Sequence, residues 1–107
     1  RNLYSRMLKL YRVKGNSMAP TLLTGDLVLV CGWLKPKVGD VVVVDTEQVG
    51  LVIKRLIALD EETLQVAGDN PASDSSINRI PLPRGRMKGK VVLRKEQRRG
   101  LKLIKAA

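Results

Sequence analysis

Ser17 is the residue of this sequence whose surroundings most favour covalent chemistry. It follows a turn-forming Gly-Asn pair and precedes Met18 and Pro20, next to a region rich in predicted strands. A serine hydroxyl is a poor nucleophile unless a base removes its proton. The 107 residues contain no histidine, which excludes a Ser-His-Asp or Cys-His nucleophile within this chain. The base must therefore be a carboxylate or a neutral lysine, and a lysine serves only when its pKa is lowered toward the working pH.

Lys54 has a sequence environment that would lower the pKa of a lysine. It lies in residues 51–57, which are apolar at five of seven positions. On a predicted strand its own face carries Val52 and Leu56, while Arg55 lies on the opposite face. Desolvation by the two apolar neighbours and the like charge of Arg55 both disfavour the ammonium form. The alternative, which the strand pattern alone favours, is a lysine whose ammonium group reaches solvent.

A third element with chemical potential is the polar loop of residues 68–76. Three of its side chains, Ser73, Asp74 and Ser75, could hydrogen-bond to a catalytic amine or brace the loop. Taken alone, the segment has the composition of an ordinary polar loop. Two Gly-Asp pairs, at residues 25–26 and 39–40, each stand just before a predicted strand, and turn geometry explains both without a function.

Short runs of apolar and β-branched residues between turn-forming residues predict a mostly β domain of short strands with little helix. The expected strands are residues 27–31, 41–44, 49–59, 63–67 and 90–94, with a hairpin turn at residues 60–62. Residues 3–11 fit either a short helix or a strand. The sequence shows no internal repeat or low-complexity linker, so we expect residues 1–107 to form a single domain. Residues 1–12 would be a basic leading segment and residues 95–107 a loosely attached basic tail.

Twenty Lys and Arg residues against ten Asp and Glu residues give a net charge of +10. The excess gathers near both termini, which predicts peripheral contact with an anionic membrane, although a solvated basic exterior has the same composition. With three aromatic residues in all, the chain lacks the interleaved aromatics of a nucleic-acid surface, so we expect no nucleic-acid partner. No apolar run approaches the ~18 residues of a membrane span. A single cysteine and no histidine predict neither a disulfide within the chain, nor a metal, nor a cofactor.

These parts occur in a defined order: G-x-S-M-x-P-T-L, G-D-L-V-L-V, K-x-G-D-V-V, I-K-R-L-I-A-L, and G-D-N-P with a D-S nearby. In that order they closely resemble the type I signal peptidase family, over about residues 13–92. The resemblance implies Ser17 as the nucleophile and Lys54 as the general base, with the backbone N–H of Ser17 in the oxyanion hole. It also implies a pocket for the residue before the scissile bond and a loop that supports the dyad. The implied pocket residues are Met18, Ile53, Val13 and Leu22, and the implied loop residues are Gly68, Asp69, Asn70, Ser73 and Asp74.

Two positions depart from the family's pattern. Gly15 stands where some members carry a serine whose hydroxyl is a second oxyanion donor, so that donor would come from another group, such as a backbone amide. Ser76 stands where the family's D-S-R has its arginine, and the nearby serine spacing is shortened. These differences concern the oxyanion hole and the polar loop, while the serine and the lysine keep their places in the pattern.

Within this family the short basic stretch before Ser17 most resembles small soluble relatives described as nickel-type superoxide dismutase maturation proteases. The implied function is a serine endopeptidase that removes an N-terminal leader or pro-segment from a protein substrate, such as a nickel superoxide dismutase precursor. The substrate is expected to bind extended beside the Ser17 loop, with small residues next to the cut. The small soluble kind implies a cytoplasmic protein, and a removed upstream anchor would imply a membrane-associated one.

The C-terminal domain of a self-cleaving repressor, which acts in transcriptional regulation and dimerisation, is the main alternative. Such domains share the Ser-Met turn and the catalytic lysine, but they cut a linker tens of residues upstream, whereas sixteen residues precede Ser17 here. The Gly-Asp-Asn loop at residues 68–70 also fits the signal peptidases better. A catalytically silent basic domain would explain the charge and leave the combination of Ser17, Lys54 and this loop without a reason.

Overall fold

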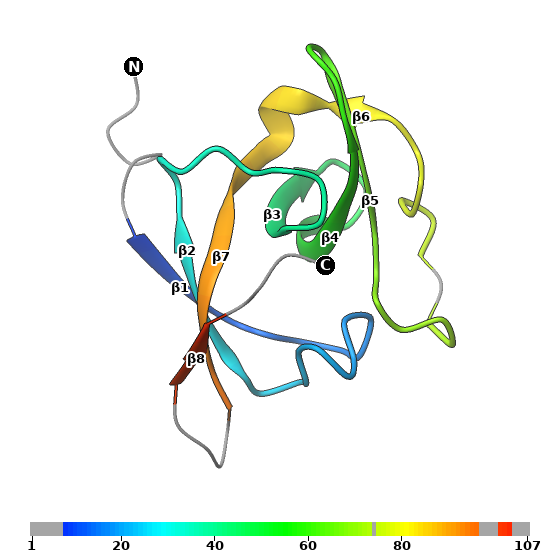
Figure 1. Cartoon of the computed structure of the whole chain (residues 1–107). Coiled ribbons are helices and arrows are strands. Elements are labelled where there is room, and N and C mark those ends of the chain that lie inside the picture. Colours follow the sequence, from blue (N-terminus) through cyan, green and yellow to red (C-terminus); the bar gives the residue numbers. More distant parts are fainter. Residues whose placement is uncertain (1–7, 74, 97–100, 104–107) are drawn as a thin grey trace.

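An eight-stranded sheet in which neighbouring strands run antiparallel makes up nearly all the regular structure (Figure 1). This computed structural model describes residues 8–73, 75–96 and 101–103. The elements in chain order are β1 (Leu8–Arg12), β2 (Leu27–Cys31), β3 (Val41–Thr46), β4 (Gly50–Leu59), β5 (Thr63–Ala67), β6 (Leu82–Pro83), the 3-10 helix η2 (Arg84–Arg86), β7 (Met87–Lys95) and β8 (Leu101–Leu103). The strand order is β1-β2-β7-β3-β4-β5-β6, with β8 beside β7. The chain is thus mostly β, as predicted.

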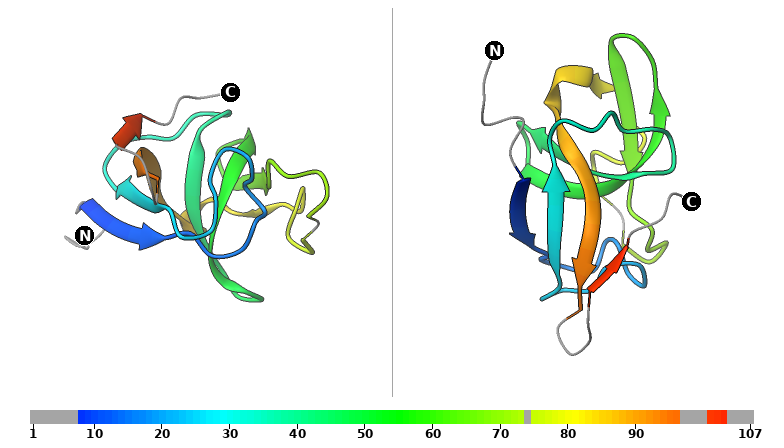
Figure 2. Two further views of the ribbon diagram at one scale, coloured as in Figure 1. Left: turned by 90° about the horizontal axis from the view of Figure 1, so that it is seen from below. Right: turned by 60° about the vertical axis from the view of Figure 1, so that its left-hand side comes forward.

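The sheet is strongly curled (Figure 2), and two hydrophobic clusters lie on its opposite faces. β3 shows the division directly, because Val41 and Val43 belong to one cluster and Val42 and Val44 to the other. A strand buried on both faces reads as a continuous apolar run rather than an alternating one. The first cluster also takes in Val13, Met18 and Leu22 from the loop between β1 and β2, packed with Val28, Val30 and Val91. That loop is therefore anchored to the core on one side of the sheet.

The predicted strands at residues 27–31 and 63–67 are confirmed with the same bounds. Those at 41–44, 49–59 and 90–94 are also present, but β3 continues to Thr46, β4 starts at Gly50, and β7 starts at Met87. Of the segment that fitted a helix or a strand, the described part is strand β1, and residues 1–7 lie outside the described residues. β6, η2 and β8 were not predicted from the sequence. Lys95 and Leu101–Leu103 fall in the predicted basic tail, but Lys95 ends β7, and Leu101–Leu103 forms β8, which pairs with β7.

Side-chain carboxylates shape the turns where the sequence predicted them. Between β4 and β5, Asp60 accepts hydrogen bonds from the backbone N–H groups of Glu62 (2.9 Å) and Thr63 (2.7 Å). The two Gly-Asp pairs act alike: Asp26 accepts from the backbone N–H of Leu23 (2.9 Å), and Asp40 accepts from that of Lys37 (2.8 Å). In each case a carboxylate accepts from backbone N–H groups of a turn, and Asp26 and Asp40, unlike the exposed Asp60, are buried. Within the part of the chain that the structure describes, no helix is long and apolar enough to cross a membrane.

Candidate active site

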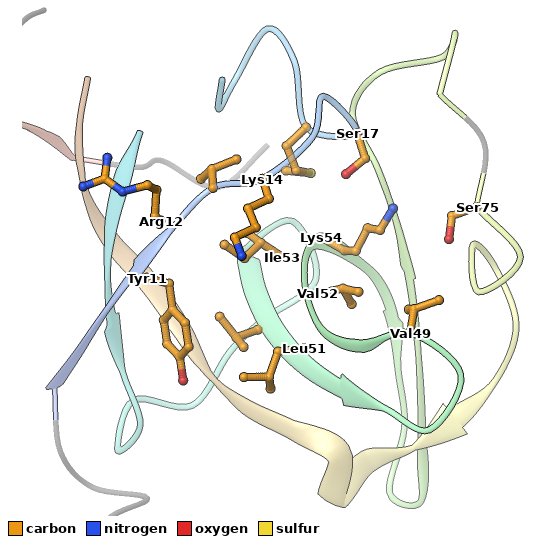
Figure 3. Close-up of a pocket in the computed structure, with 13 residues that line it drawn as sticks. Tyr11, Arg12, Lys14, Ser17, Val49, Leu51, Val52, Ile53, Lys54 and Ser75 are labelled. Carbon is orange, nitrogen blue, oxygen red and sulfur yellow. The ribbon is translucent and has the colours of Figure 1, made fainter. Parts of the chain in front are cut away.

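A cavity of about 330 Å³ lies between the end of β1 and the first half of β4 (Figure 3). It brings together segments that are some forty residues apart in the chain. Ser17 and Lys54 both line it, and in Figure 3 the hydroxyl of Ser17 and the amino group of Lys54 point into the same space. The full lining is Tyr11, Arg12, Val13, Lys14, Ser17, Met18, Val43, Val49, Leu51, Val52, Ile53, Lys54 and Ser75.

Ser17 sits in a loop whose two ends are tied together and whose middle is anchored in the core. The base of the loop is closed by two backbone hydrogen bonds, Val13 N–H to Asp26 O (2.8 Å) and Gly25 N–H to Val13 O (2.9 Å). Next to the serine, Met18 is only 2% exposed, and its carbonyl accepts a bond from the N–H of Leu22 (2.9 Å). A side chain buried immediately after the serine fixes the backbone from which the hydroxyl projects.

Lys54 lies on β4 with only 3% of its surface exposed, so its side chain does not reach solvent. It is paired across the sheet with Val42 of β3, in a part of the sheet buried on both faces. In Figure 3 its amino group extends from β4 into the space between Ser17 and Ser75. Burial of this degree disfavours the charged form of an amine. A lysine must be neutral in order to accept a proton, so this burial suits Lys54 to act as a base.

Arg55, the next residue, points to the other face and is held by Asp69. Its guanidinium donates to both carboxylate oxygens, Nε to Oδ1 (3.1 Å) and Nη2 to Oδ2 (2.6 Å), and Nη1 donates to the carbonyl of Gly39 (2.8 Å). The charge of Arg55 is thus compensated by a carboxylate. The sequence analysis expected Arg55 to disfavour the Lys54 ammonium by like charge, and this ion pair weakens that contribution.

Asp69 joins the serine loop to the lysine strand. Besides its ion pair with Arg55, it accepts a hydrogen bond from the hydroxyl of Thr21 (2.5 Å). Burial acts to raise the pKa of the Asp69 carboxyl, but the hydrogen bonds from Arg55 and Thr21 and the charge of Arg55 together lower it below its ordinary value of 3.8. The carboxylate therefore stays ionised and fixes Thr21, four residues after the serine, to the neighbour of the lysine.

The residues on either side of Asp69 hold the backbone of the serine itself. The backbone N–H of Asn70 donates to the carbonyl of Ser17 (2.9 Å), and its side-chain amide donates to the carbonyl of Asn16 (2.9 Å). Gly68 lies so close that an added β-carbon would stand 2.4 Å from the Ser17 carbonyl oxygen. All three residues of the Gly-Asp-Asn loop thus contact the serine loop, which is the arrangement that the resemblance implied for a supporting loop.

The model of the Peptidase S24-like family matches residues 3–92, a span that includes Ser17, Lys54 and the Gly-Asp-Asn loop. The chain belongs to the Peptidase S24-like family. Comparison with curated proteins gives no match. Family membership supports a peptidase-related or self-cleaving function of the Ser/Lys type in general, and it places the chain in a family related in fold to the one that the motifs resembled.

Three of the four predicted pocket residues line the cavity: Met18, Ile53 and Val13. Leu22 is not among them, because it has no exposed surface and packs in the core with Val28 and Val30. The family resemblance implied that Leu22, five positions after Ser17, lines the pocket. After the turn at residues 17–20, Leu22 lies in the hydrophobic core instead. The prediction for Leu22 is therefore corrected.

In the polar loop, the serine that lines the cavity is Ser75, on the far side of the Lys54 amino group in Figure 3. Ser73 instead folds back on the loop, where its backbone N–H donates to the carbonyl of Asn70 (3.1 Å). Asp74 lies outside the described residues. Among the described residues, no group of three or more His, Cys, Asp or Glu side chains could hold a metal ion.

The sequence analysis missed the wall of the cavity away from the serine. This wall is formed by the end of β1 and the start of β4, with Tyr11, Arg12, Lys14, Val49, Leu51 and Val52. The strand at residues 49–59 was predicted, and residues 3–11 fitted either a helix or a strand, but neither pattern could show that the curl of the sheet brings β1 and β4 to opposite sides of one cavity.

Proposed function

We propose that this chain is a serine endopeptidase in which Ser17 is the nucleophile and Lys54 the general base. The observation that carries the proposal is that Lys54, 3% exposed on an apolar strand, lines the same cavity as Ser17. A core lysine with no chemical role would be a costly choice, because burying an ammonium is unfavourable. A buried amine beside a serine hydroxyl is instead suited to accept its proton.

The reaction follows from these two groups. The neutral amine of Lys54 takes the proton of the Ser17 hydroxyl as the oxygen attacks the carbonyl carbon of the scissile bond. When that C–N bond breaks, the Lys54 ammonium returns the proton to the leaving amine, and an ester links the substrate to Ser17. Water then attacks the ester with Lys54 again accepting a proton, which releases the acid and restores the serine.

The surrounding residues supply orientation and charge stabilisation. The backbone N–H of Ser17 is the first donor to the developing oxyanion, with a further donor from the same loop or the substrate side of the cavity. Ser75 lines the same cavity as Lys54, and its proposed role is to hydrogen-bond to the Lys54 amine and orient it toward Ser17. The Gly-Asp-Asn loop keeps Ser17 at a fixed distance from β4 through Asn70 and Asp69.

The substrate would bind as an added strand. β1 ends the strand order, and β5 pairs with β4 only over Arg55–Leu59, so in the described structure no strand covers the outer edge of β1 or residues 50–53 of β4. The cavity lies between these two edges, where an extended peptide gains backbone hydrogen bonds and places alternate side chains in it. The specific activity that we propose is type I signal peptidase-like cleavage of an N-terminal leader or pro-segment after a small residue. A nickel superoxide dismutase precursor is one candidate substrate.

The test is to incubate the purified protein with leader-bearing precursors, comparing wild type, Ser17→Ala and Ser76→Ala. Ser76 is an exposed serine of the polar loop and serves as the matched control. We expect cleavage by wild type and Ser76→Ala, and a loss of several orders of magnitude, on the order of 10³ or more, in Ser17→Ala. Undiminished cleavage by Ser17→Ala would overturn the assignment. Ser17-dependent cleavage of a longer version of the chain itself, at a rate independent of protein concentration, would favour the self-cleaving alternative.

A further inference from the structure

The cavity has a one-sided charge distribution that the proposed reaction does not use. Its described lining contains three basic side chains, Arg12, Lys14 and Lys54, and no acidic one. Lys54 has the role proposed above. The guanidinium of Arg12 donates to the carbonyl of Gly25 (2.9 Å), which holds it at the base of the serine loop. Lys14 is the basic residue whose position in the cavity is not explained by the fold.

Lys14 stands three residues before Ser17 and two residues after the end of β1, and the residue is exposed. In Figure 3 its side chain extends along the cavity, and its ammonium group is drawn on the side where Ile53 lies. Among the described residues, the ion pairs join other side chains, and no carboxylate pairs with Lys14. Because the described lining holds no acidic side chain, this cation is electrostatically complementary to an anionic ligand group.

Much of the cavity wall is apolar. Leu51 and Val49 are each 53% exposed at the start of β4, and the partly buried Ile53 and Tyr11 also line the cavity. An extended peptide between β1 and β4 would therefore pass an apolar wall and then Lys14 before it reaches Ser17. Lys14 and Ser17 line the same cavity, so we expect the substrate side chain that meets Lys14 to stand a few residues before the scissile bond.

We infer that Lys14 selects substrates that carry an aspartate or glutamate shortly before the cleavage site. The inference deepens the proposed function and rests on it for the direction of the bound peptide. The competing explanation is that the lysine stem merely covers Ile53 while its charge has no ligand. Reversal of the charge separates the two, because a covering stem would not change which peptides bind.

The experiment uses fluorescent peptides with a fixed small residue at the cut and Glu, Gln or Lys at each of the preceding positions. Binding is measured by anisotropy to Ser17→Ala, which needs no catalysis, and cleavage is measured with the protein carrying Ser17. At one position we expect Glu to bind about two- to fivefold more tightly than Gln, the size of an exposed ion pair. Lys14→Gln should remove this difference, and Lys14→Glu should make Lys the preferred residue. Lys9→Glu, which changes the net charge equally from an exposed site on β1 outside the cavity lining, should preserve the preference for Glu.

Three results would overturn the inference: equal binding of Glu and Gln peptides at every position, loss of the preference in Lys9→Glu as large as in Lys14→Glu, or no peptide binding to Ser17→Ala at millimolar concentration. Cleavage without a Glu preference would leave the proposed peptidase standing and remove only the role of Lys14. A Glu preference in binding that follows Lys14, with no cleavage by wild type, would support the charge selection and count against the proposed peptidase activity.

Discussion

Gly68 lies directly against the backbone of Ser17. A β-carbon on Gly68 would stand 2.4 Å from the Ser17 carbonyl oxygen and 3.3 Å from its β-carbon. Asn70, two residues further on, continues this contact, since it donates its backbone N–H to the same carbonyl. The loop after β5 and the loop before β2 therefore approach as closely as two backbones can, and this approach sets the position of the serine relative to the lysine on β4.

We predict that Gly68→Ala displaces Ser17 and lowers kcat/KM by on the order of 10²-fold, because small misplacements of a nucleophile cost that much. The contact is with backbone, which cannot move aside as a flexible side chain could. Gly85→Ala is the matched control, since an added β-carbon there has nothing within 4 Å. If Gly68→Ala and Gly85→Ala were equally active, the proposed tie between the two loops would have no role in catalysis.

We predict that activity rises with pH through the pKa of Lys54. The base acts in its neutral form, and burial on β4 favours that form, so the pKa should lie below its ordinary value of about 10.4. A pH–rate profile of kcat/KM should therefore show an ascending limb whose midpoint reports that pKa. Lys54→Arg keeps the charge and cannot deprotonate, so it should be as inactive as Lys54→Ala.

Lys37→Arg provides the control for this prediction, because Lys37 is an exposed lysine in the loop before β3. It should retain both the wild-type rate and the wild-type pH profile. An active Lys54→Arg protein would show that the residue is not the base. A flat profile would mean that no group of the site titrates over the range measured, which contradicts the Ser/Lys mechanism.

We predict that Asp69 contributes a pH-dependent share of stability. Its pKa in the folded protein is below the ordinary value of 3.8, so the carboxylate stabilises the fold above that value, and the contribution is lost as the pH falls through the lowered pKa. Asp69→Asn should reduce the free energy of unfolding near neutral pH by about 1–3 kcal/mol, because Arg55 loses its charged partner. In urea titrations the difference from wild type should shrink below about pH 3.8.

Asp60→Asn distinguishes this effect from a general loss of carboxylates. Backbone hydrogen bonds from Thr63 and Glu62 lower the pKa of Asp60 as well, but it lies in the exposed turn between β4 and β5. Its replacement should alter the acid limb of stability and leave kcat/KM unchanged, whereas Asp69→Asn should reduce both. Equal activity of the two variants would show that the link between Thr21 and Arg55 does not position the dyad.

Much of the fold could be predicted because most strands show a local pattern of apolar residues between turn-forming residues. Residues 41–44 form a continuous valine run because β3 is buried on both faces, and Asp60 marks its turn by accepting backbone hydrogen bonds. β6 and β8 are two and three residues long, too short for a periodic pattern, and Leu82–Pro83 contains a proline. Their pairing depends on neighbouring strands already in place, which local sequence does not encode.

The candidate site also has a part that the sequence predicts and a part that it does not. Ser17 and Lys54 could be singled out from residue type and spacing, and the Gly-Asp-Asn loop from the resemblance. What the sequence could not show is the partner of each side chain: that Asp69 pairs with Arg55, or that Ser75 rather than Ser73 lines the cavity. These are long-range relations between loops. They depend on the curl of the sheet, which no local pattern of hydrophobicity reports.

The last prediction compares two predicted pocket residues, one that lines the cavity and one that lies in the core. Ile53 lines the cavity and is partly buried, while Leu22 is fully buried in the core. Ile53→Ala should enlarge the space for the residue before the cut, so that substrates with a larger residue there gain in kcat/KM relative to alanine. Leu22→Ala should leave this ratio unchanged and lower the free energy of unfolding by about 2–5 kcal/mol, the cost of a core cavity. Peptides that differ only at that residue, together with urea unfolding of both variants, provide the measurement. A changed substrate preference in Leu22→Ala, with stability intact, would return Leu22 to the pocket.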